Sequence, residues 1–115
     1  MKEDELFRRI ALALPDVEEK SHFGKPDFRV CNKIFAGFSD KGRAYVKLSP
    51  EQQEMLTATE PHLVAAHQGH WGRQGWTWID HSAADKALLE SVLLMAWKTV
   101  APKTVLKQNF PASLS

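Results

Sequence analysis

The sequence is poor in several features that would assign it to a specialised class. It contains one cysteine, Cys31, so no disulfide can form within the chain and a reducing compartment is the expected environment. The first residues mix charges of both signs with apolar residues, which argues against a secretory signal. No hydrophobic stretch reaches membrane-spanning length. We therefore expect a cytoplasmic protein with no membrane partner.

Sequence motifs for catalysis are also scarce. There is no phosphate-binding loop and no dinucleotide fingerprint. His62, His67 and His70 have a loose spacing that could bind zinc, yet no cysteine or glutamate-rich motif accompanies them. Cys31 lies in an apolar run without an oxyanion-forming glycine motif, so a buried or half-buried thiol is expected. We predict no catalytic residue, no metal site and no cofactor.

Charge is nearly balanced overall but unevenly distributed. The formal net charge of +1 excludes a chain that attracts nucleic acid through its total charge alone. The segment from Lys20 to Lys47, however, has seven basic residues against Asp27 and Asp40, a local excess of five. If this segment forms one surface, that surface is positive.

The 115 residues, of which 43% are hydrophobic, fit one domain spanning 1–115. Its core is expected over about residues 5–104, and the C-terminal tail 105–115 is expected to be loose. An amphipathic helix is predicted from Glu5 to Leu14, where Pro15 ends it. Residues 27–48 then read as three antiparallel strands, DFRV, KIFAGF and AYVKL, joined by Asn32-Lys33 and SDKGR.

The second half contains two further helices and one strand. Ser49 as N-cap, Pro50 at the first position and Gln52 in a capping box predict a helix that ends near Ala58. HLVAA reads equally as a helical turn or as an extended piece, and WTWID reads as a strand. Ser82 and Asp85 open the longest helix, which runs to Pro102, and Asp80-His81 is expected to help cap it. The order α-β-β-β-α-β-α predicts a two-layer α+β domain, an antiparallel sheet packed by helices.

Alternation assigns the strand residues to two faces. With Asn32-Lys33 as the turn, one face carries Phe28, Val30, Phe35, Gly37, Tyr45 and Lys47, and the other carries Arg29, Cys31, Ile34, Ala36, Phe38, Ala44, Val46 and Leu48. The second face is the better core, although a slip of one residue would reverse the assignment.

The stretch GHWGRQGWTWID holds three of the four tryptophans. Trp76 and Trp78 share one strand face, which favours a core seam against the long helix with Trp97 as neighbour. The alternative concerns Trp71 and Arg73, which on a glycine-rich loop would remain exposed as a pair that stacks on bases and contacts phosphates.

Several segments together resemble a known family. SHFGKPDFRV, KIFAGF, VKLSPEQQEML, GHWGRQGWTWID and AWKTVAPK match, in order and spacing, the motifs of the MmcQ/YjbR family of small bacterial proteins. The resemblance covers the chain from the first helix to Pro102. It implies a compact α+β domain similar to the type III secretion chaperone fold, and a DNA-binding role, and it supplies no catalytic motif.

Two functions of different classes follow. The first is a non-enzymatic DNA-binding module with a basic hairpin surface, whose predicted contacts are Lys25, Lys33, Lys41, Arg43, Lys47, Trp71 and Arg73. The second is a protein-interaction or chaperone-like module, binding a partner chain or a second copy through an exposed apolar or Trp-rich surface. Lysines at hairpin tips also serve simply to protect strand edges. A small-molecule pocket between sheet and long helix is a third, weaker reading.

Overall fold

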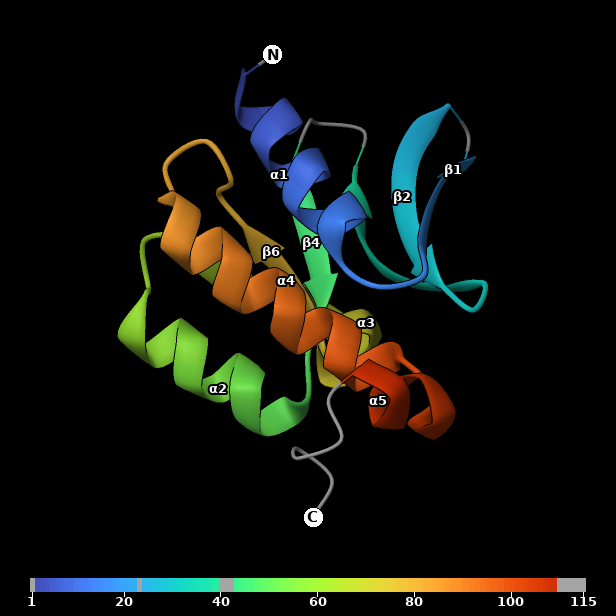
Figure 1. Cartoon of the computed structure of the whole chain (residues 1–115). Helices are drawn as coiled ribbons and strands as arrows, with labels where there is room; N and C mark the ends of the chain where they lie inside the picture. The colour runs from blue at the N-terminus through green and yellow to red at the C-terminus, as the bar shows by residue number, and fades with distance from the viewer. Residues whose placement is uncertain (1, 23, 40–42, 110–115) are drawn as a thin grey trace.

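Six strands pair into one antiparallel sheet, and this sheet organises the molecule (Figure 1). The computed structural model describes residues 2–22, 24–39 and 43–109. The strands are β1 Val17–His22, β2 Lys25–Val30, β3 Lys33–Phe38, β4 Ala44–Lys47, β5 Val64–Ala66 and β6 Trp76–Ile79, in the spatial order β1-β2-β3-β4-β6-β5. The helices are α1 Lys2–Ala13, α2 Pro50–Thr59, α3 Gly69–Arg73, α4 Lys86–Val100 and α5 Lys103–Asn109. The predicted α+β class is confirmed.

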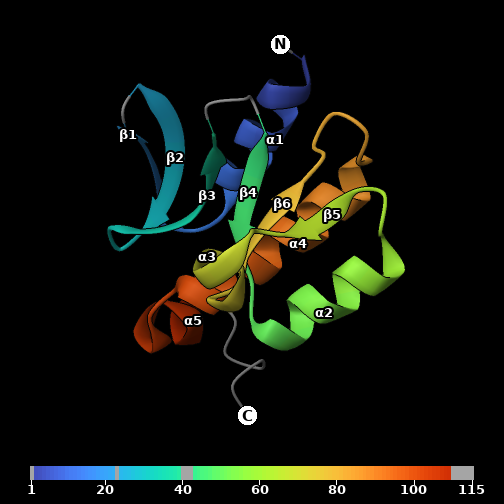
Figure 2. The same ribbon diagram turned by 180° about the vertical axis from the view of Figure 1, so that it is seen from behind.

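Helices α1 and α4 cover one face of the sheet, and the core lies between these two layers (Figures 1 and 2). In α4 the buried residues recur at helical spacing, from Leu89 through Leu93 to Trp97. The indole Nε1 of Trp97 donates to the backbone carbonyl of Pro15 at 2.9 Å, which ties α4 to the end of α1. Of the helices in the described part of the chain, the short α3 alone lies on the opposite face of the sheet, near one end (Figure 2); this face is called the open face below.

The predicted helix signals are present in the structure. Ser49 caps α2 and Gln52 completes the capping box, with each side chain bonded to the other residue's backbone N–H. Asp85 caps α4 through the N–H of Leu88. Asp80 and His81 do not cap α4: Asp80 bonds to the N–H of Ala83 in the preceding turn.

Three elements of the structure were not predicted, and a fourth, β5, is one of the two alternatives that the sequence allows for its segment. β1, with the sequence VEEKSH, is too polar for a hydrophobic pattern to reveal, which is typical of a protected edge strand. HLVAA, whose sequence fits both a helical turn and an extended piece, contains β5, and the expected glycine-rich loop contains the five-residue helix α3. Residues 105–109, expected to be loose, belong to α5 and bury Val105. No helix in the described part of the chain is long and apolar enough to cross a membrane.

The β2–β3 hairpin differs from its predicted register. Its turn is Cys31-Asn32, one residue earlier than expected, and both residues have the positive φ that a type I′ turn requires. A β-bulge follows, because Phe28 opposes Ala36 whereas Arg29 opposes Ile34, which leaves one extra residue in β3. The bulge splits the predicted faces. The core contains Phe28, Val30 and Phe35 together with Ala36, Phe38, Ala44, Val46 and Leu48.

Candidate functional site

The open face of the sheet carries a group of aromatic side chains. Trp76 and Trp78 alternate with Thr77 and Ile79 along β6, and it is Thr77 and Ile79 that are buried in the core. The predicted core seam between the two tryptophans and α4 is therefore wrong. Alternation correctly placed Trp76 beside Trp78, but the helices cover the other face of the sheet.

Tyr45 connects the two tryptophans. In the pairing of β4 with β6, Tyr45 lies opposite Trp78, and its ring meets Trp76 edge-on at a centroid distance of 5.5 Å and Trp78 at 6.3 Å. His67, just after β5, stacks on Trp78 at 4.8 Å with an interplanar angle of 24°. Edge-on and offset-stacked rings are favourable arrangements for aromatic pairs. We call Tyr45, His67, Trp71, Trp76 and Trp78 the aromatic cluster.

Two of the predicted basic residues contact this cluster. The guanidinium carbon of Arg43 lies 4.1 Å from the ring centroid of Trp78, and the ammonium of Lys47 lies 5.1 Å from that of Trp76. Both distances are within the range of cation–π attraction. Trp78 is thus held from both strands that flank β6, by Arg43 from the β4 side and by His67 from the β5 side.

Gly37 makes room for the Tyr45 ring. A Cβ atom at Gly37 would lie 2.7 Å from Cζ of Tyr45 and closer still to its hydroxyl, so only glycine leaves the ring in place. The Tyr45 hydroxyl lies over Gly37, whose partner in β2 is Asp27, and Asp27 forms an ion pair with Arg29 at 2.8 Å. Burial raises the pKa of Tyr45, the Asp27 charge raises it further, and Arg29 opposes both.

Helix α3 supplies Trp71, the remaining member of the cluster. Trp71 is 55% exposed, more than any other large hydrophobic residue that the structure describes. The amide of Gln53 in α2 donates to the carbonyls of Gly72 and Trp76 and to the hydroxyl of Thr77, which fixes α3 against β6. Trp71 and Arg73 are both exposed, as in the alternative interpretation of this stretch, although they lie on a helix rather than on a loop.

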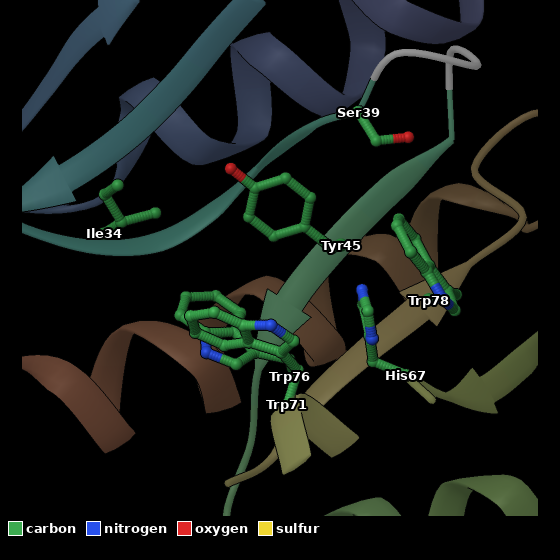
Figure 3. A pocket seen from close by; sticks show the side chains of 7 residues that line it. All are labelled: Ile34, Ser39, Tyr45, His67, Trp71, Trp76 and Trp78. Atoms are coloured by element: carbon green, nitrogen blue, oxygen red, sulfur yellow. The ribbon is translucent and has the colours of Figure 1, made fainter. Parts of the chain in front are cut away.

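The aromatic cluster surrounds a cavity of about 290 Å³, completed by Ile34 and Ser39. Figure 3 shows Trp71 and Trp76 on one side and His67 with Trp78 on the other, with Tyr45 between them. Ser39 lies at the end where β3 leads into β4, and its hydroxyl is buried with no hydrogen-bond partner among the described residues. None of the seven lining residues is acidic.

The remaining predicted basic residues do not gather at this cavity. Lys33 begins β3 whereas Arg43 immediately precedes β4, so β3 separates the two hairpin tips by about 17 Å. Lys25 begins β2 and lies near Ser39, with which it lines a separate hollow. Lys41 lies outside the described residues. Arg73 ends α3, two residues after Trp71. The predicted basic hairpins therefore point to opposite ends of the sheet.

The weaker catalytic and metal candidates have other surroundings. Cys31 is exposed in the β2–β3 turn, not buried in a strand as expected. His67 stacks on Trp78, and His70 bonds to Gln74 at 2.9 Å. Over residues 2–22, 24–39 and 43–109, no group of three potential ligands could hold a metal ion. His81 pairs with Asp4 at 2.6 Å, which links the loop before α4 to α1.

Sequence reasoning missed four residues of this site: Gly37, Ser39, Tyr45 as a cluster member, and His67. A glycine in the middle of a strand pattern signals close approach of another group, and Gly37 in KIFAGF was such a signal. The alternation had also put Tyr45, Lys47 and Gly37 on one face, which the register confirms. Ser39 and His67 had no comparable signal, because both lie at strand ends where the pattern stops.

Comparison with known proteins agrees with this architecture. A search of curated proteins found no significant match. The crystal structure of protein DR2400 from Deinococcus radiodurans, with a DUF419 domain, is similar to this chain with a TM-score of 0.67 and 24% sequence identity. That alignment covers 91% of this chain and 85% of the other. The family model named YjbR matches residues 12–99, which is most of the sequence. The chain therefore belongs to the YjbR family.

Proposed function

We propose that this protein is a nucleic-acid-binding module that uses the open face of its sheet. The observation that carries the proposal is the exposed Trp71 beside a cavity whose walls are aromatic and whose neighbouring charges are cations. Nucleic acids offer the complementary chemistry, because bases stack on aromatic rings and phosphates pair with Lys and Arg.

The charges on this face favour a polyanion. Arg43 and Lys47 are held against tryptophan rings, with their charged groups beside the cavity. Asp27, whose charge acts on Tyr45, is already bonded by two nitrogens of Arg29 at 2.8 and 3.2 Å. An approaching phosphate therefore meets two cations, and the negative charge of Asp27 is neutralised by its own partner.

An apolar protein partner fits this face less well. Covering the cavity with apolar side chains would also remove Arg43 and Lys47 from water, and burying an unpaired charge is costly. The exposure of Trp71 still supports a protein-interaction module, or a dimer of this chain, as the second candidate. The two candidates differ in salt dependence, which is steep for phosphate contacts and weak for apolar ones.

The test is titration of labelled oligonucleotides with the protein, followed by fluorescence anisotropy over a series of salt concentrations. The double variant Arg43→Gln/Lys47→Gln removes the two cations of the cluster. If each contacts one phosphate, the slope of log K against log salt falls by about 1.4 for a single strand or 1.8 for a duplex.

The matched control removes two charges from the helix-covered side. Arg9 and Lys86 are exposed on α1 and α4, so Arg9→Gln/Lys86→Gln changes the net charge equally and leaves the open face intact. The control should bind like the original protein. Absence of binding at low salt, or equal weakening by both double variants, would contradict the proposal. Lys25, Lys33, Lys41 and Arg73 remain predicted contacts, to be substituted singly in the same assay.

A further inference from the structure

We propose that the cavity of the aromatic cluster binds one unpaired base, so that this protein selects single-stranded nucleic acid over duplex. This inference rests on the proposed function and adds the substrate class. The cavity has a volume of about 290 Å³, at the lower end of small-molecule sites. One flat ring system matches this space, and a base inside a duplex is stacked and paired, so it has no free faces to offer.

Trp71 is the ring that is available for stacking. Trp78 is already held by Arg43 and His67, and Trp76 by Lys47 and the edge of Tyr45. Trp71 meets only the edge of His70 among the described ring contacts, and 55% of its surface is exposed beside the cavity. A base that enters the cavity can therefore stack on Trp71 without displacing a protein side chain.

Ser39 supplies a polar group for the edge of that base. Its hydroxyl oxygen is buried and has no hydrogen-bond partner in the described structure, although it lines a cavity with mostly apolar walls. A buried hydroxyl without a partner is uncommon, because the missing bond costs free energy. In Figure 3 this hydroxyl points away from Tyr45, so it would reach a base only after rotation about the Cα–Cβ bond of Ser39. A serine hydroxyl both donates and accepts, so after that rotation it can pair with an edge atom of any base. We expect base binding with little preference among the four bases.

The positions of the two cations indicate a strand and not a free nucleotide. Arg43 and Lys47 are four residues apart along an extended chain, which places their backbones about 13 Å apart with Tyr45 midway. A mononucleotide cannot reach both cations, whereas two phosphates of one extended strand, with one further phosphate between them, can follow β4 past the cavity. A base attached between those phosphates then lies next to Tyr45 and Trp71.

The test compares three ligands of equal length: a mixed-sequence single strand, a blunt duplex, and an abasic single strand that keeps every phosphate and lacks the bases. We expect the single strand to bind roughly 5- to 150-fold more tightly than the abasic strand, which is the effect of stacking one base. The duplex should also bind more weakly than the single strand. Thymidine monophosphate should bind far more weakly than the strand.

Two variants connect this preference to the cavity. Trp71→Ala should lower single-strand affinity most of the way to that of the abasic strand and leave abasic binding unchanged. Ser39→Ala should lower single-strand affinity about fivefold, again without effect on the abasic strand. Both variants should keep the fold, because Trp71 is exposed and the Ser39 hydroxyl has no hydrogen-bond partner in the described structure. An unchanged unfolding midpoint for each variant checks this.

The outcomes separate the two proposals. If no ligand binds at low salt, the proposed function fails and this inference fails with it. If duplex, abasic strand and single strand bind equally, or if Trp71→Ala leaves single-strand affinity unchanged, nucleic-acid binding stands and the base site is refuted. Thymidine monophosphate binding as tightly as the strand would refute the path along β4.

Discussion

Replacing Gly37 by alanine should disturb the aromatic cluster with the addition of a single methyl group. The φ of Gly37 is not in the left-handed region, so alanine is compatible with the backbone. The obstacle is steric, because the new Cβ would lie 2.7 Å from Cζ of Tyr45 and 3.1 Å from the carbonyl oxygen of Pro26. The strand is fixed by its pairing with β2 and β4, so the Tyr45 ring has to move outward.

The size of the effect follows from how tightly Tyr45 is held. Overpacking a core costs about 1–3 kcal/mol. Tyr45 is half-buried and its ring can swing toward solvent, so we expect the lower half of that range, about 1–2 kcal/mol. With a urea m-value of about 2 kcal/mol/M, the unfolding midpoint falls by roughly 0.5–1 M. The pKa of Tyr45 should fall toward the ordinary value of about 10, because burial is the main cause that raises it.

The assay is selective because Tyr45 is the single tyrosine of the chain. Tyrosinate absorbance against pH therefore reports this residue alone. Gly24→Ala is the control: Gly24 has a φ of 78° with open space around its Cβ, so alanine costs about 1–2 kcal/mol of backbone strain and leaves the Tyr45 titration unchanged. If Gly37→Ala shows the original midpoint and the original titration, Tyr45 does not occupy the space over Gly37.

Three further predictions concern stability. Ser49→Ala should cost about 1 kcal/mol in the free energy of unfolding, since the α2 cap is lost, and an unshifted midpoint would contradict the capping box. Gln53→Ala should cost about 1–3 kcal/mol, because the Thr77 hydroxyl loses its donor and the carbonyls of Gly72 and Trp76 each lose one of two donors. Gln53→Glu should cost more, because it sets a carboxylate against those carbonyls; equal midpoints for both variants would refute this. Because the pKa of Tyr45 is raised, the folded state keeps a proton that the unfolded state loses above about pH 10, so the free energy of unfolding should fall as pH rises through that region. Unfolding of Tyr45→Phe, measured at each pH, should show a shallower fall. An equal fall would exclude Tyr45 as a cause.

Elements with local signals could be predicted from the sequence, and elements defined by distant partners could not. Ser49, Gln52 and Asp85 act within one helical turn, so their residue types and spacing were sufficient. β1 has a polar sequence and is recognisable only by its pairing with β2. The buried side of β6 also depends on distant residues, since Thr77 is satisfied there by Gln53 of α2.

A strand pattern identifies which residues share a face but not which face the helices cover. Trp76 and Trp78 were therefore grouped correctly and placed on the wrong side. In β3 the bulge adds a second uncertainty, because the extra residue at Phe35 changes the phase of the alternation between Ile34 and Ala36. From Ala36 to Leu48 the predicted core face is correct, whereas from Phe28 to Ile34 the two predicted faces are exchanged.

The distribution of aromatic residues over the two faces is difficult to explain by stability alone. The covered face buries Phe7, Phe28, Phe35 and Trp97 fully, so the core has large aromatic side chains without the open face. On the open face, half-buried tryptophans lie beside two cations and an unpaired hydroxyl, and Trp71 remains mostly exposed. Apolar surface left in water contributes nothing to folding until something covers it. A ligand with flat apolar rings and negative charges would cover this face, pair its cations and satisfy its hydroxyl together.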